Sequence, residues 1–292
     1  MSFALRRTTG DDDLELSRAH AIIARPRRGT IAWSDFDPSL FDAEDLAQAS
    51  VAWNGRVIQE YHSLALFTQL ASQVHLLGAP LDWSGAFARM IADEVRHTDI
   101  CARMAGALGA SEPVKIEPDH LHLASGASSL RAHVRDTIVA AFCIGETLSG
   151  RMFRGCHRAA TVPLARAAVR AIVIDETFHA AFGWEAAALL MRDDGLEFAR
   201  ERSALAASLP GLFRHYCRLS CAEKGPDWAR AEMQAPPAPN FGTLSEAGYA
   251  HAFFEGMRDD VVPGLVAIGL PEAVEAFRDL VDEKAYQGRR PR

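Results

Sequence analysis

The sequence predicts an all-α protein. Apolar residues recur with the 3.6-residue period of an amphipathic helix along most of the chain. Alternating runs of β-branched residues, which are typical of strands, are scarce. The breaks between the long periodic segments contain glycine or proline. With 49% hydrophobic and 24% charged residues, the 292-residue chain can also bury a large core.

Four long helices and four shorter ones are expected. The long helices are predicted at about 43–77, 83–109, 127–159 and 162–191. The shorter helices are predicted near 11–24, 195–221, 245–261 and 271–286. Gly78-Ala79-Pro80 separates the first long pair, and Thr161-Val162-Pro163 separates the second. In the second break, Thr161 is the expected N-cap and Pro163 suits the first helical turn.

Two stretches of the chain are expected to be irregular. The stretch 110–126 contains two prolines, and the stretch 225–243 contains four. Neither has the polar, low-complexity composition of a free interdomain linker. We therefore predict a single domain over residues 1–292, with a helix bundle at about 43–191 and flanking helices at 11–24 and 195–286.

Charge and composition exclude several classes of protein. The chain has 31 Lys+Arg against 38 Asp+Glu, a net charge of −7, so no basic domain is available for a nucleic acid. Arg25, Arg27 and Arg28 are interpreted as a short solvated cluster. There is no recognisable signal peptide and no apolar run of about 18 residues, which predicts a cytoplasmic protein with no membrane partner. Five cysteines without a CxxC motif argue against a disulfide framework or a cysteine metal site.

A five-residue pattern occurs in two of the long helices. It reads Asp93-Glu94-Val95-Arg96-His97 in the second and Asp175-Glu176-Thr177-Phe178-His179 in the fourth. Residues three apart share a helix face, so each Glu and His can reach the same metal ion. With 18 Glu and 11 His, chance gives about 0.7 Glu-x-x-His matches, but only about 0.05 when an Asp must precede. The repeated pattern is therefore a candidate metal motif.

The other two long helices each contain a conspicuous glutamate. Glu60 and Glu146 lie deep in otherwise apolar helices, where a lone charge would be costly to bury. Four-helix di-metal sites use one Glu from each of two helices and a Glu-x-x-His pair from each of the others. Glu146 and Glu176 are each about 21–24 Å of helix from the break near residue 160, so a hairpin would bring them to one height.

This order of ligands resembles the ferritin-like di-iron carboxylate superfamily, over residues 43–191. The resemblance implies a ferritin-like four-helix bundle with a long crossover at 110–126 and additional flanking helices. It implies that two iron ions are held by six residues, which would be both the metal ligands and the catalytic set, and that Glu94 and Glu176 bridge the ions. A manganese–iron pair uses the same ligand types. The six residues are Glu60, Glu94, His97, Glu146, Glu176 and His179.

The resemblance also assigns roles to the neighbours of the ligands. Asp93 would accept a hydrogen bond from His179, and Asp175 one from His97, which would fix the orientation of each ring. Arg96 would neutralise these acids, and Phe178 stands where related sequences often have a second arginine.

Details of the motifs point to the oxygen-activating branch of the superfamily. The form Asp-Glu-x-Arg-His is most similar to bacterial multicomponent monooxygenases, acyl-carrier-protein desaturases and arylamine N-oxygenases. Cys101 stands where ribonucleotide reductase small subunits carry a radical tyrosine and methane-monooxygenase-like hydroxylases carry a cysteine. Ile172 stands where arylamine N-oxygenases have an additional histidine, so N-oxygenation is not established. Gly145 and Gly150 would permit a π-bulge beside Glu146.

The resemblance implies an O2-dependent oxidoreductase, a di-iron monooxygenase or oxidase acting on a small organic substrate. Hydroxylation, N-oxygenation and desaturation all stay open. No flavin, haem or iron–sulfur motif is apparent, so an external reductase or ferredoxin is the expected electron donor, and a homodimer is a compatible assembly. The alternatives are a ferritin-like ferroxidase or iron-binding protein, and a metal-free helical scaffold with a buried polar network. Apolar neighbours of the ligands would line a substrate pocket; they include Phe67, Met90, Cys101, Phe142 and Ile172.

Overall fold

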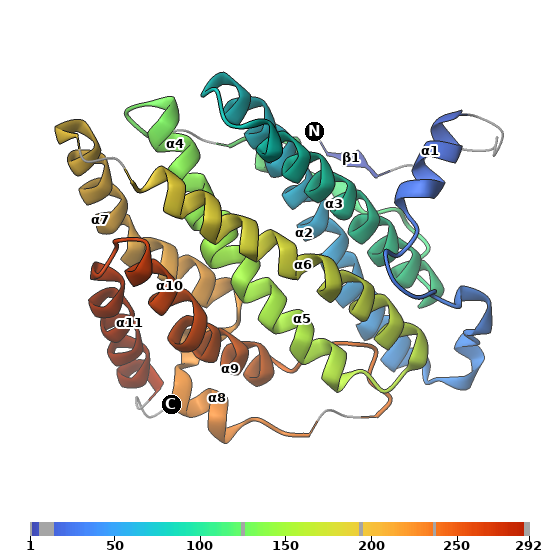
Figure 1. Cartoon of the computed structure of the whole chain (residues 1–292). Helices are drawn as coiled ribbons and strands as arrows, with labels where there is room; N and C mark the ends of the chain where they lie inside the picture. The colour runs from blue at the N-terminus through green and yellow to red at the C-terminus, as the bar shows by residue number, and fades with distance from the viewer. Residues whose placement is uncertain (1, 6–14, 124–125, 193–194, 236–237, 289–292) are drawn as a thin grey trace. The chain divides into compact units, whose positions relative to one another are not determined.

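The computed structural model describes residues 2–5, 15–123, 126–192, 195–235 and 238–288. These residues are helical almost throughout, which confirms the all-α prediction (Figure 1). The chain forms two compact units. The first contains Met1–Ser125, Ala160–Asp175 and Ala238–Thr243, and the second contains Gly126–Ala159, Glu176–Pro237 and Leu244–Arg292. The single domain and the ferritin-like arrangement stay predictions.

The first unit is built around an antiparallel pair of long helices, α2 and α3, which pack against each other. Gly78, with φ 69°, makes the turn between them. The predicted helices 43–77 and 83–109 are confirmed to within two residues. The α-helices of this unit are α1 (Glu15–Ile23), α2 (Ala43–Leu76), α3 (Leu81–Ala107) and the part of α6 (Pro163–Leu190) that ends at Asp175. Its 3-10 helices are η1 (Trp33–Asp35), η2 (Pro38–Leu40) and η3 (Pro118–His120), and its two short strands are β1 (Phe3–Ala4) and β2 (Lys115–Ile116). Residues 11–14 of the predicted first helix lie outside the described residues.

A short segment distant in sequence completes the core of the first unit. The indole Nε1 of Trp53 donates to the carbonyl of Phe241 at 2.9 Å, and Arg56 donates to the carbonyl of Gly242 at 2.6 Å. Gly242 has φ 78°, and a Cβ there would lie 2.8 Å from Val169 of α6. These contacts tie residues 238–243 to α2 and to the first part of α6.

The residues just before α6 show one difference from the expected capping. The hydroxyl of Thr161 accepts a hydrogen bond from the backbone N–H of Asn240 at 2.7 Å. Thr161 therefore joins the 238–243 segment to the start of α6, and Pro163 begins the helix as predicted.

The second unit contains the remaining helices. They are α4 (Leu130–Thr137), the π-helix η4 (Ile138–Glu146), α5 (Thr147–Ala159), the rest of α6, α7 (Leu196–Leu219), η5 (Ala222–Lys224), α8 (Pro226–Ala231), α9 (Glu246–Gly256), the π-helix η6 (Met257–Val261), α10 (Val262–Ala267) and α11 (Glu272–Gly288). Arg135 of α4 is 1% exposed and pairs with Glu201 of α7 at 3.0 Å, which joins these two helices.

Two predictions in the second unit were wrong in detail. The stretch 225–243 was expected to be irregular, but it contains the short helix α8, in which Pro226 occupies the first turn. The helix predicted to end at 261 continues to Ala267, although Pro263 lacks the N–H of a regular helical turn. The π-helix η6 lies just before this proline, and α10 continues past it with Pro263 in its first turn.

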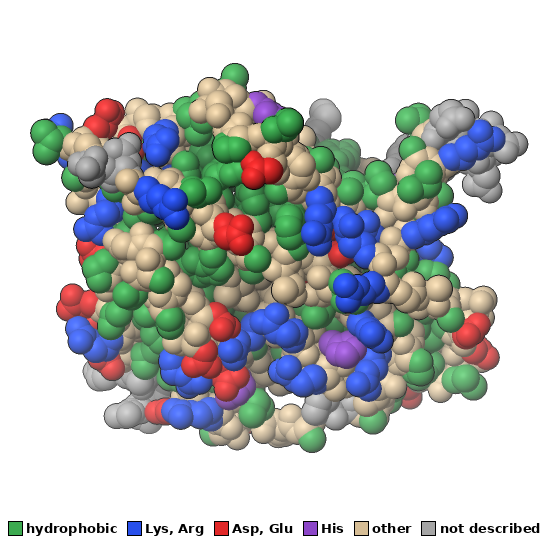
Figure 2. Space-filling view, viewed as in Figure 1, with side chains coloured by type: hydrophobic (Ala, Val, Ile, Leu, Met, Phe, Trp, Pro, Cys, Tyr) green, Lys and Arg blue, Asp and Glu red, His purple; other side chains and the backbone are tan. Residues whose placement is uncertain are grey.

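The surface carries both signs of charge. On the face drawn in Figure 2, Lys and Arg side chains alternate with Asp and Glu and with apolar side chains. Six acidic residues predicted to lie inside are at most 8% exposed, so the net charge of −7 overstates the negative surface; they are Glu60, Asp93, Glu94, Glu146, Asp175 and Glu176. Among the helices that the structure describes, none combines the length and the apolar character needed to cross a bilayer.

Candidate metal centre

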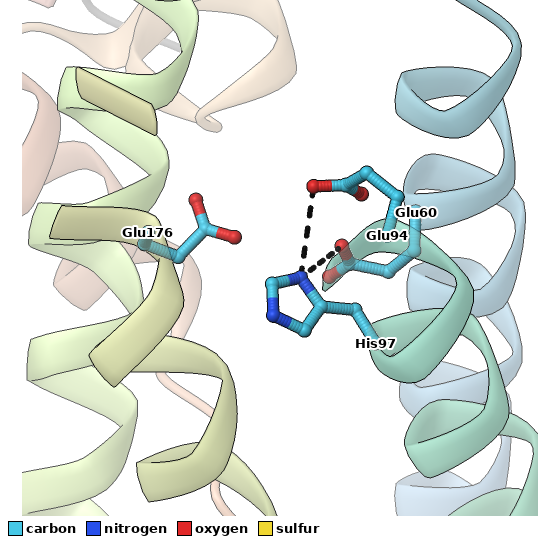
Figure 3. Close-up of side chains that lie close together, drawn as sticks. All are labelled: Glu60, Glu94, His97 and Glu176. Carbon is cyan, nitrogen blue, oxygen red and sulfur yellow. Dashed lines mark ion pairs between the residues drawn. The ribbon is translucent and has the colours of Figure 1, made fainter. Parts of the chain in front are cut away.

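The first unit contains a buried cluster of two carboxylates and an imidazole. Helix α2 provides Glu60, and α3 provides Glu94 and His97 from one face. Each offers a ligand atom within 4.8 Å of the others. Nδ1 of His97 lies 3.4 Å from Oε2 of Glu60 and 3.7 Å from Oε1 of Glu94 (Figure 3). The three residues are 6%, 1% and 0% exposed, so water screens their charges weakly.

The opposite nitrogen of His97 faces a third carboxylate. Its Nε2 lies 3.4 Å from Oδ2 of Asp175, which confirms the predicted contact between these residues. Nη1 of Arg96 donates to Asp93 at 2.6 Å and to Asp175 at 2.9 Å. Arg96 is 5% exposed, so a buried guanidinium compensates the two buried aspartates as predicted. A partner at Nε2 leaves Nδ1 directed toward Glu60 and Glu94.

A second arginine in this network was missed in the sequence. Arg27 was interpreted as part of a solvated cluster, but its guanidinium donates to Asp93 at 2.7 Å and lies 3.2 Å from Asp175. The backbone carbonyl of Arg25 also accepts from Nε of Arg96 at 2.8 Å. Arg27 thus provides a second guanidinium to this network. Only the tertiary packing of the N-terminal segment brings Arg27 to this position.

The carboxylates around His97 change its acidity. Burial alone would lower the pKa of His97, but hydrogen bonds with the carboxylates of Asp175, Glu60 and Glu94 outweigh it and hold the pKa well above its ordinary value. Imidazolium is therefore the favoured form among these acids. A divalent cation at the same position would provide the positive charge instead, and would require neutral imidazole as its ligand.

The second unit contains a cluster of the same composition. Glu146 ends the π-helix η4, and Glu176 and His179 lie on one face of α6. Their ligand atoms lie within 4.8 Å of one another, with Nδ1 of His179 3.6 Å from Glu146 and 4.0 Å from Glu176. All three residues are buried. The predicted hydrogen bond between His179 and Asp93 joins residues of different units and stays a prediction.

The π-helix beside Glu146 confirms the predicted departure from α-helical geometry. Its wider turns leave carbonyl groups in need of partners, and the hydroxyl of Tyr216 on α7 donates to the carbonyl of Ala140 at 2.8 Å. A Cβ on Gly145 would lie 2.8 Å from this hydroxyl oxygen, so glycine makes room for the tyrosine. Burial and the charge of Glu146 raise the pKa of Tyr216, which keeps the phenol protonated as a donor.

A second glycine lets α6 approach the π-helix closely. A Cβ on Gly183 would lie 2.4 Å from Cβ of Phe142 and 3.0 Å from its carbonyl carbon. Because the backbone of η4 occupies this space, only glycine fits without a shift of the helix. Gly183 thereby holds the helix of Glu176 and His179 close to the helix that ends with Glu146. Tyr216 and Gly183 have no sequence pattern that would have identified these roles.

Both clusters fit a divalent cation by their donor chemistry. Buried carboxylates with one imidazole are a ligand set for iron, manganese or zinc, whereas thiolate-preferring sites require cysteine. Cys101, near the first cluster, has a pKa raised well above its ordinary value by burial and by the charge of Glu60, so its thiol stays protonated. Five of the apolar neighbours expected to line a substrate pocket are at most 1% exposed; they are Phe67, Met90, Cys101, Phe142 and Ile172.

Helix α6 connects the two clusters along the chain. It is continuous from Pro163 to Leu190, and the limit between the units falls between two consecutive residues of this helix. Asp175 contacts His97 in the first unit, and Glu176 belongs to the cluster of the second. Comparison of the chain with protein-family models, curated proteins and solved structures gives no match.

Proposed function

We propose that this chain is a di-iron oxygenase or oxidase that uses O2 to oxidise a small organic substrate. The observation that supports it is the repetition of one buried donor set. In each unit, a Glu from one helix meets a Glu-x-x-His pair from another, with all ligand atoms within 4.8 Å. Buried carboxylates are costly unless a cation compensates them, so a repeated set of this kind favours two metal ions.

The number of protein ligands favours a reactive metal site over a purely structural one. Each cluster provides three protein ligands, and an ion that prefers six-fold coordination would keep positions for exogenous molecules. Two ferrous ions held there would provide the electrons that reduce O2. A manganese–iron pair would suit the same residues.

The protein's own groups would orient the ligands and exclude water. Asp175 fixes the ring of His97 from its far side, and Arg96 and Arg27 hold Asp175 in turn. Tyr216 stabilises the π-helix that presents Glu146. The buried apolar neighbours of the clusters keep bulk water away, which protects reactive oxygen species from wasteful side reactions.

The reaction class stays open between hydroxylation, N-oxygenation and desaturation. In each reaction, full reduction of O2 takes four electrons, and the substrate provides two of them. The other two must come from outside this chain. An external reductase or ferredoxin is the donor that we propose, because the sequence has no flavin, haem or iron–sulfur motif.

Anaerobic reconstitution with ferrous iron tests the proposal. The wild-type chain should bind about two iron ions, and Glu94→Ala and His179→Ala should each lose iron and substrate-dependent O2 uptake. Glu117→Ala is the matched control, because Glu117 and His120 also form a Glu-x-x-His pair but lie at a 3-10 turn instead of an α-helix. This control should keep full iron binding.

Exposure of the reconstituted protein to O2 separates the alternatives. Uptake that rises with a candidate organic substrate supports an oxygenase or oxidase. Uptake that needs only ferrous iron, with ferric mineral as the product, would instead indicate a ferroxidase. Full iron binding and O2 uptake in both Glu94→Ala and His179→Ala would exclude the proposed site.

A further inference from the structure

A cavity lies in the first unit, apart from the Glu and His clusters. It has a volume of about 780 Å³ and lies between α1, the segment 24–33 and the C-terminal half of α3. Small-molecule sites typically measure about 300–1,000 Å³, so the cavity can hold a compact organic ligand. Its residues on α3 are Asp99, Ile100 and Arg103, which follow His97 along the helix.

The lining combines apolar surface with an excess of positive charge. Apolar side chains come from all three walls; they include Leu16, Ala21, Ile31 and Ile100. The charged lining residues are Arg25, Arg103 and Asp99, so with His20 neutral the formal charge is 2 − 1 = +1. The chain as a whole has a net charge of −7, so this cavity differs in sign from the protein around it.

The one acidic group of the lining already has a basic neighbour. Asp99 is 5% exposed, and its Oδ1 lies 3.4 Å from Nε2 of His20 on α1. This contact joins α1 to α3 at the cavity. The two arginines outnumber this single carboxylate, so they give the cavity its positive charge.

Arg103 is held in an orientation that suits recognition of a carboxylate. Its guanidinium carbon lies over the Trp33 ring, 4.3 Å from the ring centroid, in a cation–π contact. A guanidinium can bind a carboxylate as a fork through the N–H groups that lie in its plane. Trp33 also lines the cavity, and it offers apolar surface beside the charge.

The connecting wall of the cavity is fixed by the network around the first cluster. Arg25 lines the cavity, and its carbonyl accepts from Arg96 at 2.8 Å. Two residues later, Arg27 pairs with Asp93 at 2.7 Å. The segment is therefore anchored on both sides of Pro26, and less ordering entropy is lost when a ligand binds.

We propose that this cavity binds a small organic carboxylate with an apolar body. The carboxylate would pair with Arg103 and Arg25, and the body would pack between Ile31, Ile100 and the edge of Trp33. This site goes beyond the proposed oxidation chemistry and does not depend on it, because none of its lining residues belongs to the Glu and His clusters.

Titration calorimetry with benzoate tests the site on the full chain. The protein is measured as purified and again after EDTA treatment, so that a metal ion cannot bind the carboxylate. Benzyl alcohol and benzylamine serve as neutral and cationic probes of similar size. Wild type should bind benzoate saturably and more tightly than either, with the same affinity after EDTA.

Variants locate the benzoate within the molecule. Arg103→Gln should weaken benzoate binding about tenfold, as expected for loss of a charge-assisted fork, and Arg103→Lys should weaken it less. Trp33→Leu, checked for native helicity by circular dichroism, should also weaken it. Arg278→Gln, an exposed arginine of α11 that pairs with Glu275, should leave it unchanged.

Several results would overturn the proposal. These are no saturable benzoate binding by folded wild type, unchanged affinity in Arg103→Gln, equal loss in Arg278→Gln, tighter binding of benzylamine, or loss of binding after EDTA. The benzoate measurement needs no iron. Its result can therefore support the carboxylate site when iron reconstitution contradicts the proposed oxidase function, and it can contradict the site when reconstitution supports that function.

Discussion

His97 of α3 and Asp175 of α6 place an imidazole nitrogen and a carboxylate oxygen 3.4 Å apart in the core of the first unit. They are 78 residues apart in sequence, and both side chains are at most 1% exposed. Asp175 also meets Arg96, so one carboxylate orients the imidazole while a guanidinium compensates its charge. The stability of this region therefore depends on Asp175.

Asp175→Asn should destabilise the metal-free protein by about 3 kcal/mol, because a buried guanidinium loses a charged partner. Urea unfolding in EDTA measures this loss. Asp227→Asn is the matched control, since Asp227 pairs with Arg230 on the surface and is 62% exposed. The control should change stability by less than about 0.5 kcal/mol. Equal effects of the two changes would contradict the role assigned to Asp175.

Arg27→Gln should destabilise the protein by about 1.5 kcal/mol, which is the lower range for a hydrogen bond to a charged group. Arg27 is 36% exposed, so solvent screens part of the interaction with Asp93 and Asp175. Its neighbour Arg28 is exposed, and Arg28→Gln should have an effect near zero. Thermal unfolding of both variants would measure the difference, and a larger effect of Arg28→Gln would show that Arg27 is only a surface residue.

Tyr216→Phe should cost about 1 kcal/mol, because the half-buried carbonyl of Ala140 loses its donor. Gly145→Ala should also destabilise the protein, since the added Cβ would lie 2.8 Å from the Tyr216 hydroxyl. The two changes should be less than additive, because removing the hydroxyl relieves the clash. A double-mutant cycle of unfolding free energies measures this coupling. Strict additivity would mean that the two residues do not interact.

Gly183→Ala and Gly55→Ala should change stability in opposite directions. At Gly183 the new Cβ would meet the backbone of Phe142, which should cost about 2 kcal/mol or more. At Gly55, in the middle of α2, a Cβ has open space, so alanine should stabilise the helix by about 0.5–1 kcal/mol. Chemical unfolding of both variants checks the sign, and a neutral Gly183→Ala would show that α6 can move away from η4.

The raised pKa of His97 predicts two pH effects of opposite sign. In the metal-free protein, the charged imidazole stabilises the fold fully below its unfolded pKa of 6.5, and this stability is lost as pH rises through the folded pKa. Metal binding requires the neutral ring, so affinity for Zn²⁺ should instead increase with pH. Calorimetry at pH 7 in buffers of different ionisation enthalpy should show more proton release for wild type than for His97→Gln. Equal release would contradict the proposal that His97 is protonated in the metal-free protein and loses its proton when the metal binds.

Much of the fold could be predicted because the helical period is local. Each long helix was located to within a few residues from apolar spacing and from glycine and proline at its ends. The local patterns did not predict α8. They also did not predict that the helix continues past Pro263, a residue type that ordinarily ends a helix but here follows a π-helix. The departure beside Glu146 could be anticipated because two glycines flank that residue.

The candidate ligands were also readable from the sequence, since Glu and His three apart share a helix face whatever packs against it. The all-α character of the chain and the members of both Glu and His clusters could be predicted from the order of the residues alone. Three features became visible only in the packed molecule: Arg27 joins Asp93 and Asp175, Tyr216 supports the π-helix, and a cavity lies beside Trp33 and Arg103. Helical periodicity relates neighbours in the chain, whereas these contacts join residues 66 to 148 positions apart, so they depend on how the elements pack in shape and charge.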